Sequence, residues 1–71
     1  MKKAEFMKYL GDMTEALGAP SMFKINPFDF AALVADTEPQ YWFFSDKVQT
    51  FCGIPFEKSP DVAIGTVEFY P

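Results

Sequence analysis

Four aromatic residues stand side by side in this chain, Tyr41-Trp42-Phe43-Phe44. A strand that covers a core with one face needs an apolar side chain only at every second position, because successive side chains point to opposite faces of the sheet. The run therefore supplies twice as many apolar side chains as such a strand requires. Either a helix covers the second face of the strand, or part of the run is exposed and binds a partner.

The length of the chain makes large side chains valuable. Its 71 residues suffice for a single domain, residues 1–71, with no room for a second core. A domain of this size buries only about 60% of the surface of its unfolded chain. Nine Phe, three Tyr and one Trp compensate for this, since each can bury about 150–250 Å². The single cysteine, Cys52, cannot form an internal disulfide, and its apolar neighbours predict a buried thiol.

Residues 3–17 are predicted to form an amphipathic helix. Apolar residues recur along this segment with helical spacing and form one stripe, namely Phe6, Leu10, Met13 and Leu17. Gly18 is a good stop, because glycine readily adopts the left-handed conformation that ends many helices, and Pro20 cannot continue the helix.

A short strand over residues 21–25 and a second helix are expected to follow. Asn26 can cap this helix, Pro27 suits its first position, and a carboxylate at Asp29 interacts favourably with the helix dipole. Pro39 ends the helix by residue 38 at the latest. Its buried face is predicted to contain Phe30, Leu33, Val34 and Thr37.

The segment 40–57 fits two structures. Tyr41, Phe44, Val48 and Phe51 have a helical spacing, which would give a third helix ending at Gly53. The aromatic and β-branched content and the turn-like Ser45-Asp46-Lys47 favour instead a strand at 40–44, a turn and a strand at about 48–57. In that strand Gly53 and Pro55 indicate a bulge or an edge position.

In the second structure Tyr41 and Phe43 face the core, and Trp42 and Phe44 face the other way. A last strand over residues 65–70 alternates, with Val67 and Phe69 inward. Together these elements predict an α+β domain in which two short helices pack on one face of a small, mainly antiparallel sheet of three to four strands. The strand at 21–25 is expected at the edge of an antiparallel meander formed by the three later strands.

The composition excludes most enzyme chemistry. The chain has no histidine, so general-base catalysis by imidazole and the Ser-His and Cys-His mechanisms are absent. One cysteine without histidine excludes ordinary zinc and iron–sulfur sites, and no glycine-rich phosphate loop is present. We therefore expect no enzyme activity, no cofactor and no metal. All six basic residues are scattered lysines, which argues against direct binding of nucleic acid, and no apolar run approaches the ~18 residues of a membrane span.

One stretch resembles a known group of proteins. Gly53-Ile-Pro-Phe-Glu-Lys-Ser-Pro60, followed by Gly65-Thr-Val-Glu-Phe69, is similar to a hairpin that recurs in small tailed-bacteriophage proteins, and in phage capsid proteins in particular. The chain is far too short for the capsid fold. The resemblance implies a small phage-encoded protein that acts in the cytoplasm of a host cell. Proteins of this kind include inhibitors of host defence, among them anti-CRISPR proteins, and minor structural parts of the virion.

These observations predict a non-enzymatic protein-binding module, an inhibitor or modulator of a host protein complex. The alternative is a small virion structural or assembly protein that works through self-association, for example as a homodimer. The net charge of −4 favours a basic partner, such as a nucleic-acid-binding complex. The residues expected to bind the partner are Trp42, Phe44, Asp36, Asp46, Glu57 and Asp61.

Overall fold

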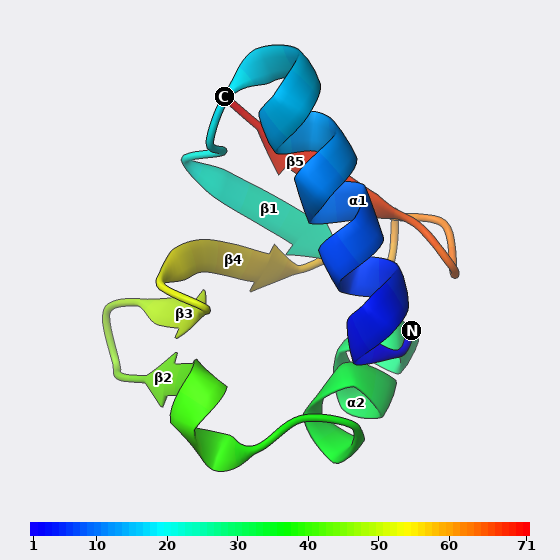
Figure 1. Cartoon of the computed structure of the whole chain (residues 1–71). Coiled ribbons are helices and arrows are strands. Elements are labelled where there is room, and N and C mark those ends of the chain that lie inside the picture. The colour runs from blue at the N-terminus through cyan, green and yellow to red at the C-terminus, as the bar shows by residue number, and fades with distance from the viewer.

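The sheet of this protein is mixed, with one parallel pair inside it. The computed structural model describes residues 1–71, and Figure 1 shows how its two helices and five strands are arranged. The elements are α1 (Lys3–Leu17), β1 (Met22–Ile25), α2 (Pro27–Ala35), the 3₁₀ turn η1 (Pro39–Tyr41), β2 (Trp42–Phe44), β3 (Gln49–Phe51), β4 (Ile54–Lys58) and β5 (Val67–Tyr70). The predicted α+β class is confirmed, with five strands in place of three to four.

Both helices pack on the same face of the sheet. Phe6 of α1 and Leu33 of α2 belong to one buried cluster with residues of the strands, which are Phe23, Ile25, Phe51 and Phe56. The ring of Phe6 lies 5.0 Å from the rings of Phe23 and Phe51, edge to face in both pairs. Edge-to-face pairs stabilise beyond the area that they bury, so aromatic side chains stabilise this small core, as the composition suggests.

Helix α1 begins and ends as predicted, but its apolar stripe is only partly buried. Phe6 is fully buried and Leu10 packs against the core, whereas Leu17 is 70% exposed. The prediction for Leu17 was wrong because the last turn of α1 projects beyond the sheet (Figure 1). In the helix that follows β1, Leu33 is buried and Val34 is 38% exposed, so Val34 was also placed incorrectly.

The start of α2 is fixed by two buried polar residues. The Asn26 side chain accepts a hydrogen bond from the Phe28 N–H at 2.9 Å, as predicted for a cap, and donates one to the Val62 carbonyl at 2.9 Å. Asp29 is only 4% exposed, although the sequence indicated no more than a dipole interaction. Its carboxylate pairs with the Met1 ammonium group at 3.1 Å and accepts the Gly65 N–H at 2.7 Å. Asp29 therefore connects three segments of the chain.

Strand β1 is central rather than at an edge. The strand order is β2-β3-β4-β1-β5, with β1 parallel to β4 and all other neighbours antiparallel. The segment between β1 and β4 holds α2 and the β2–β3 hairpin, which is long enough for the crossover that a parallel pair requires. An antiparallel meander is present, but it consists of β2, β3 and β4, and the predicted inclusion of the strand at 65–70 is wrong because β5 pairs only with β1. Since β1 separates β4 from β5, residues 53–60 and 65–69 do not pair with each other as a hairpin.

A tight turn at Cys52 and Gly53 divides the strand predicted at 48–57. Phe51 pairs with Ile54, which leaves two residues in the turn. Their φ angles are +52° and +80°, with the positive signs that a type I′ turn requires. Gly53 thus marks a turn and not a bulge. Cys52 is exposed, which contradicts the predicted buried thiol.

Cys52 is the only residue other than glycine with a positive φ angle, and this predicts a stabilising substitution. Asparagine tolerates this conformation far better than cysteine, and Asn-Gly is the preferred pair for such a turn. We expect Cys52→Asn to raise the free energy of unfolding by about 0.5–1 kcal/mol, which corresponds to a few degrees in melting temperature. Thermal unfolding followed by circular dichroism measures it. Cys52→Val, which is β-branched, should lower stability instead, and a rise with both substitutions would contradict the explanation.

The aromatic run is split between two structures. Tyr41 lies in η1, so the alternation of a strand begins only at Trp42. Trp42 pairs with the fully buried Phe51 and shares its face, with the two rings 4.3 Å apart. Phe43 points to the face that no helix covers and is 57% exposed. The predicted orientation is correct for Tyr41, which packs against the core, and wrong for Trp42 and Phe43. It is also wrong for Phe44, which lies on the same face as Trp42 and stacks on it.

Candidate protein-binding surface

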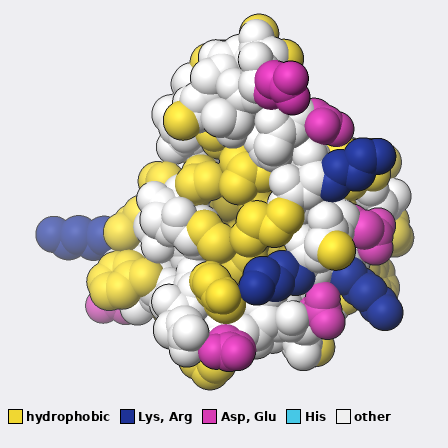
Figure 2. Space-filling view, viewed as in Figure 1, with side chains coloured by type: hydrophobic (Ala, Val, Ile, Leu, Met, Phe, Trp, Pro, Cys, Tyr) yellow, Lys and Arg dark blue, Asp and Glu magenta, His cyan; other side chains and the backbone are white.

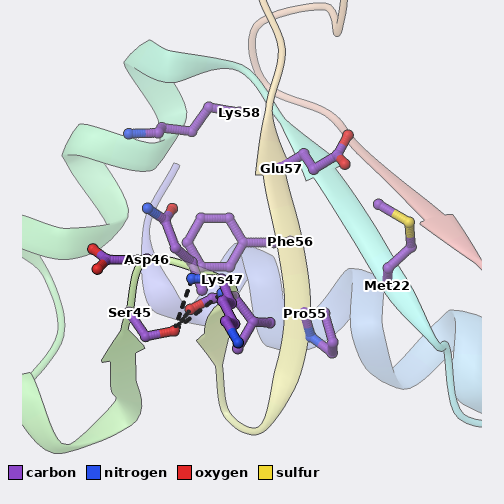
Figure 3. Close-up of a pocket in the computed structure, with 10 residues that line it drawn as sticks. Met22, Ser45, Asp46, Lys47, Pro55, Phe56, Glu57 and Lys58 are labelled. Carbon is purple, nitrogen blue, oxygen red and sulfur yellow. Dashed lines mark hydrogen bonds between the residues drawn. The ribbon is translucent and has the colours of Figure 1, made fainter.

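The surface has one hollow, a groove of about 520 Å³ between the β2–β3 turn and β4 (Figure 3). It is lined by Met22, residues Ser45 to Gln49 and residues Pro55 to Lys58. The turn is held by the Ser45 side chain, which accepts the N–H groups of Lys47 and Val48 and donates to the Val48 carbonyl at 2.8 Å. This wall of the groove is therefore fixed by local hydrogen bonds.

The opposite wall is a strand with an unpaired edge. Strand β4 has five residues and β3 has three, and their pairing ends at Thr50 opposite Pro55. Beyond that point β4 is paired only with β1. The Ser59 N–H donates to the Ile25 carbonyl in β1. Because main-chain groups alternate in direction along a strand, the N–H and C=O of Lys58 point the other way, towards the groove.

Charged and apolar side chains are mixed around the groove. Figure 3 shows Glu57 and Lys58 leaving β4 in opposite directions, with Glu57 on the side of Met22. Lys58 extends towards α2, where its ammonium group lies 4.6 Å from the ring centre of Phe30. Asp46 and Lys47 come from the turn. None of these four charged groups forms an ion pair, since the only ion pair of the chain joins Met1 and Asp29.

The structure brings together two of the six predicted site residues. Asp46 and Glu57 both line the groove. Asp36 ends α2, where its carboxylate accepts the Lys3 N–H at 2.8 Å, and Asp61 lies in the loop after β4. Neither of these lines the groove. Sequence reasoning missed Met22 and Lys58, which only the pairing of β4 with β1 brings to this position.

The two predicted aromatic anchors differ in exposure. The Trp42 indole packs between Phe51 and Phe56 and donates to the Thr37 hydroxyl at 2.8 Å, so Trp42 is a structural residue. Phe44 stacks on Trp42 at 5.7 Å with nearly parallel rings and is 53% exposed. Phe44 and Phe43, which point to opposite faces of the hairpin, and Val48 are its exposed apolar side chains, and we call the three the hairpin cluster. Pro39 was a sequence feature that could have indicated the exposure of Phe43. Proline favours the first position of a helical turn, and such a turn delays the start of the strand to Trp42, which directs Phe43 to the uncovered face.

Apolar side chains also reach the surface elsewhere on the face that carries α1. Figure 2 shows them across the centre of this face, with acidic and basic side chains around them. Because helix α1 covers only part of the sheet (Figure 1), some apolar side chains of this face remain accessible to solvent.

Partial burial raises the pKa of the Cys52 thiol above its ordinary value, and the nearby Lys3 offsets this only in part. The hydrogen bond to Glu68 raises the pKa of the Tyr70 hydroxyl. Both groups lie outside the groove, and the Cys52 thiol stays protonated at neutral pH. No three acidic, cysteine or histidine side chains lie close enough together to hold a metal ion.

Neither helix is long and apolar enough to cross a bilayer. In comparisons with known proteins, the chain matches no family model, no curated protein and no solved structure.

Proposed function

We propose that this protein is a non-enzymatic protein-binding module whose groove takes an extended segment of a partner protein. The observation that supports this function is the unpaired edge of β4 along one wall of the only hollow on the surface. An extended peptide can hydrogen-bond to such an edge and so add a short strand to the sheet, while its side chains alternate between the two faces. The main chain then supplies affinity, and the lining side chains supply selectivity.

The charges of the chain favour a basic partner. Asp29 is the one acid that forms an ion pair, so the other nine acids have no basic partner within a protein of net charge −4. At the groove, Glu57 lies beside Met22 on the face that no helix covers, where a basic side chain of the bound segment would meet it. Complementary charge of this kind accelerates association and selects among partners.

We further infer that the partner belongs to a host cell and that the protein inhibits or modulates it, as anti-defence and anti-CRISPR proteins do. Two observations support this step. The first is the resemblance of residues 53–60 and 65–69 to small phage proteins, and the second is the acidic surface, which suits the basic protein of a nucleic-acid-binding complex. Four of the lining residues of the groove, Pro55 to Lys58, lie within this stretch.

Capture experiments with charge variants test the proposed function. The immobilised protein is incubated with lysate of host bacteria, and the captured proteins are identified. We expect the wild type to retain a basic, nucleic-acid-binding complex and Glu57→Lys to retain about tenfold less, since the variant repels the basic segment and a tenfold change needs only ~1.4 kcal/mol. Glu15→Lys, on the exposed surface of α1, makes the same charge change away from the groove and serves as the control.

Equal capture by all three proteins would show that the groove is not the binding site. Specific, Glu57-dependent capture of a complex without any role in host defence would support the binding module and contradict the anti-defence role. The second candidate, a virion structural or assembly protein that self-associates, is favoured by one observation, which is the open outer edge of β2.

A further inference from the structure

We propose that two copies of this chain pair through the outer edges of their β2 strands, antiparallel, about a two-fold axis at Phe43. This edge lies on the side of the hairpin away from the groove, because β3 separates β2 from β4. The pairing therefore does not depend on what the groove binds. It assigns a partner, a second copy of the chain, to the hairpin cluster.

The hydrogen bonds of the hairpin show which main-chain groups of β2 are free. The Tyr41 carbonyl accepts the Cys52 N–H at 2.9 Å, and the Ser45 N–H donates to the Val48 carbonyl at 3.0 Å. Odd-numbered residues of this segment thus direct their main-chain groups towards β3, and even-numbered residues direct theirs outwards. The Trp42 N–H is occupied, because it donates to the Pro39 carbonyl in η1.

Three outward groups remain: the Trp42 carbonyl and both main-chain groups of Phe44. In an antiparallel pair with Phe43 opposite Phe43, the Phe44 N–H faces the Trp42 carbonyl of the second copy. The two-fold axis repeats this bond in the other direction, so both donors find free acceptors. The occupied Trp42 N–H lies opposite the Phe44 carbonyl of the second copy and does not donate to it, so the pairing forms two of the four bonds of a regular ladder. These two bonds make the edge self-complementary in this register.

The side chains fit the same register on both faces of the sheet. Phe43, which is 57% exposed, lies opposite Phe43 of the second copy in a non-hydrogen-bonded pair, where side chains approach most closely. On the other face the stacked Trp42 and Phe44 lie opposite Phe44 and Trp42 of the second copy. Aromatic cross-strand pairs are among those that stabilise sheets. The pairing covers Phe43 and Phe44, the two aromatic members of the hairpin cluster.

The contrast between the two edges of the sheet favours a second copy at β2. Natural edge strands avoid pairing through charged residues, prolines or bulges. Strand β5 carries the exposed Glu68 within it, whereas β2 consists of three aromatic residues and has none of these features. An uncharged strand also meets its own copy without repulsion. Since η1 and the turn confine the pairing to three residues, the dimer is weak and depends on concentration.

Sedimentation equilibrium of the full chain up to about 1 mM tests the pairing, because an interface this short is expected to bind in the micromolar to millimolar range. We expect the wild type to dimerise and Phe43→Lys to lower the association constant at least about tenfold, since it places two ammonium groups opposite each other. Phe28→Lys, at a side chain that is 75% exposed on α2, is the matched control and should dimerise as the wild type does.

Hydrogen exchange of the wild type gives a second measurement that needs no variant. The Phe44 amide should become more protected as concentration rises, while the Lys47 amide in the turn should not change. Any one of three results would overturn the inference: a monomer at the highest concentration, dimerisation unaffected by Phe43→Lys, or a dimer in which the Phe44 amide is unprotected. Glu57→Lys should dimerise as the wild type does, and Phe43→Lys should still capture the partner that binds the groove. The two variants therefore distinguish failure of the proposed dimer from failure of the proposed groove binding.

Discussion

Phe6→Ala lowers the free energy of unfolding by about 3–5 kcal/mol, the usual cost of truncating a buried phenylalanine. Phe6 is fully buried and its ring packs edge to face on Phe23 and Phe51, with Phe69 at 5.7 Å. The cavity would open between α1 and the sheet, where no other side chain can fill it without moving the helix. A domain of 71 residues has a total stability of about 4–11 kcal/mol. This one substitution therefore removes much or all of the stability of the fold.

Urea denaturation followed by circular dichroism and by the fluorescence of Trp42 measures this loss, because the indole packs in the same core. Phe28→Ala is the matched control. It removes the same atoms from a side chain that is 75% exposed, and it should change stability by less than about 0.5 kcal/mol. Similar losses for the two variants would mean that the ring of Phe6 is not at the centre of the core.

The importance of Phe6 could be predicted from the sequence, and the exposure of Leu17 could not. Both residues lie on the same apolar stripe, which shows the direction that the helix presents to the core. Where the sheet ends beneath the helix depends on the lengths of β1 and β5, and the pattern of α1 contains no information about them. Periodicity thus identified the buried face of the helix but not its extent.

The aromatic run shows a second limit of sequence patterns. Alternation was applied from Tyr41, but Pro39 starts a 3₁₀ turn that keeps Tyr41 out of the strand. Shifting the start of an alternating pattern by one residue exchanges the two faces. Trp42 is therefore packed on Phe51, and Phe43 is the exposed ring. The run is thus divided: Tyr41 and Trp42 pack against the core, Phe43 and Phe44 are accessible, and no helix covers the second face of the sheet.

Prediction of the candidate site would have required the pairing of strands that lie far apart in the sequence. The acids Asp46 and Glu57 could be proposed from charge alone, but the groove between them exists because β4 is longer than β3. The unpaired edge at Lys58 requires in addition the parallel pairing with β1, which spacing along the chain does not reveal. Asp36 and Asp61 have the same charge but lie away from the groove. Composition cannot distinguish acids that share a site from acids that do not, so charge alone could not exclude these two.

Asp29→Asn is the other substitution with a large expected effect, and the sequence predicted only a weak one. An acid in the first turn of an exposed helix contributes about 0.3–1 kcal/mol through the helix dipole. In the structure the Asp29 carboxylate is 5% exposed and pairs with the partly buried Met1 ammonium group 3.1 Å away. Asparagine keeps an oxygen for the Gly65 N–H but leaves the ammonium group without its counter-charge. A hydrogen bond to a charged group contributes about 1.5–3 kcal/mol, and we expect a loss of this size.

Urea denaturation of residues 1–71 measures the effect, with Asp12→Asn on the exposed side of α1 as the control that removes the same charge. Acetylation of the Met1 amine provides the decisive comparison, because it removes the other member of the pair. If the ion pair is the cause, Asp29→Asn costs clearly less in the acetylated chain than in the free one, since the two changes remove the same interaction. Additive losses would instead assign the role of Asp29 to its bond with Gly65, and the charge of Met1 would then contribute little to holding α1 against α2.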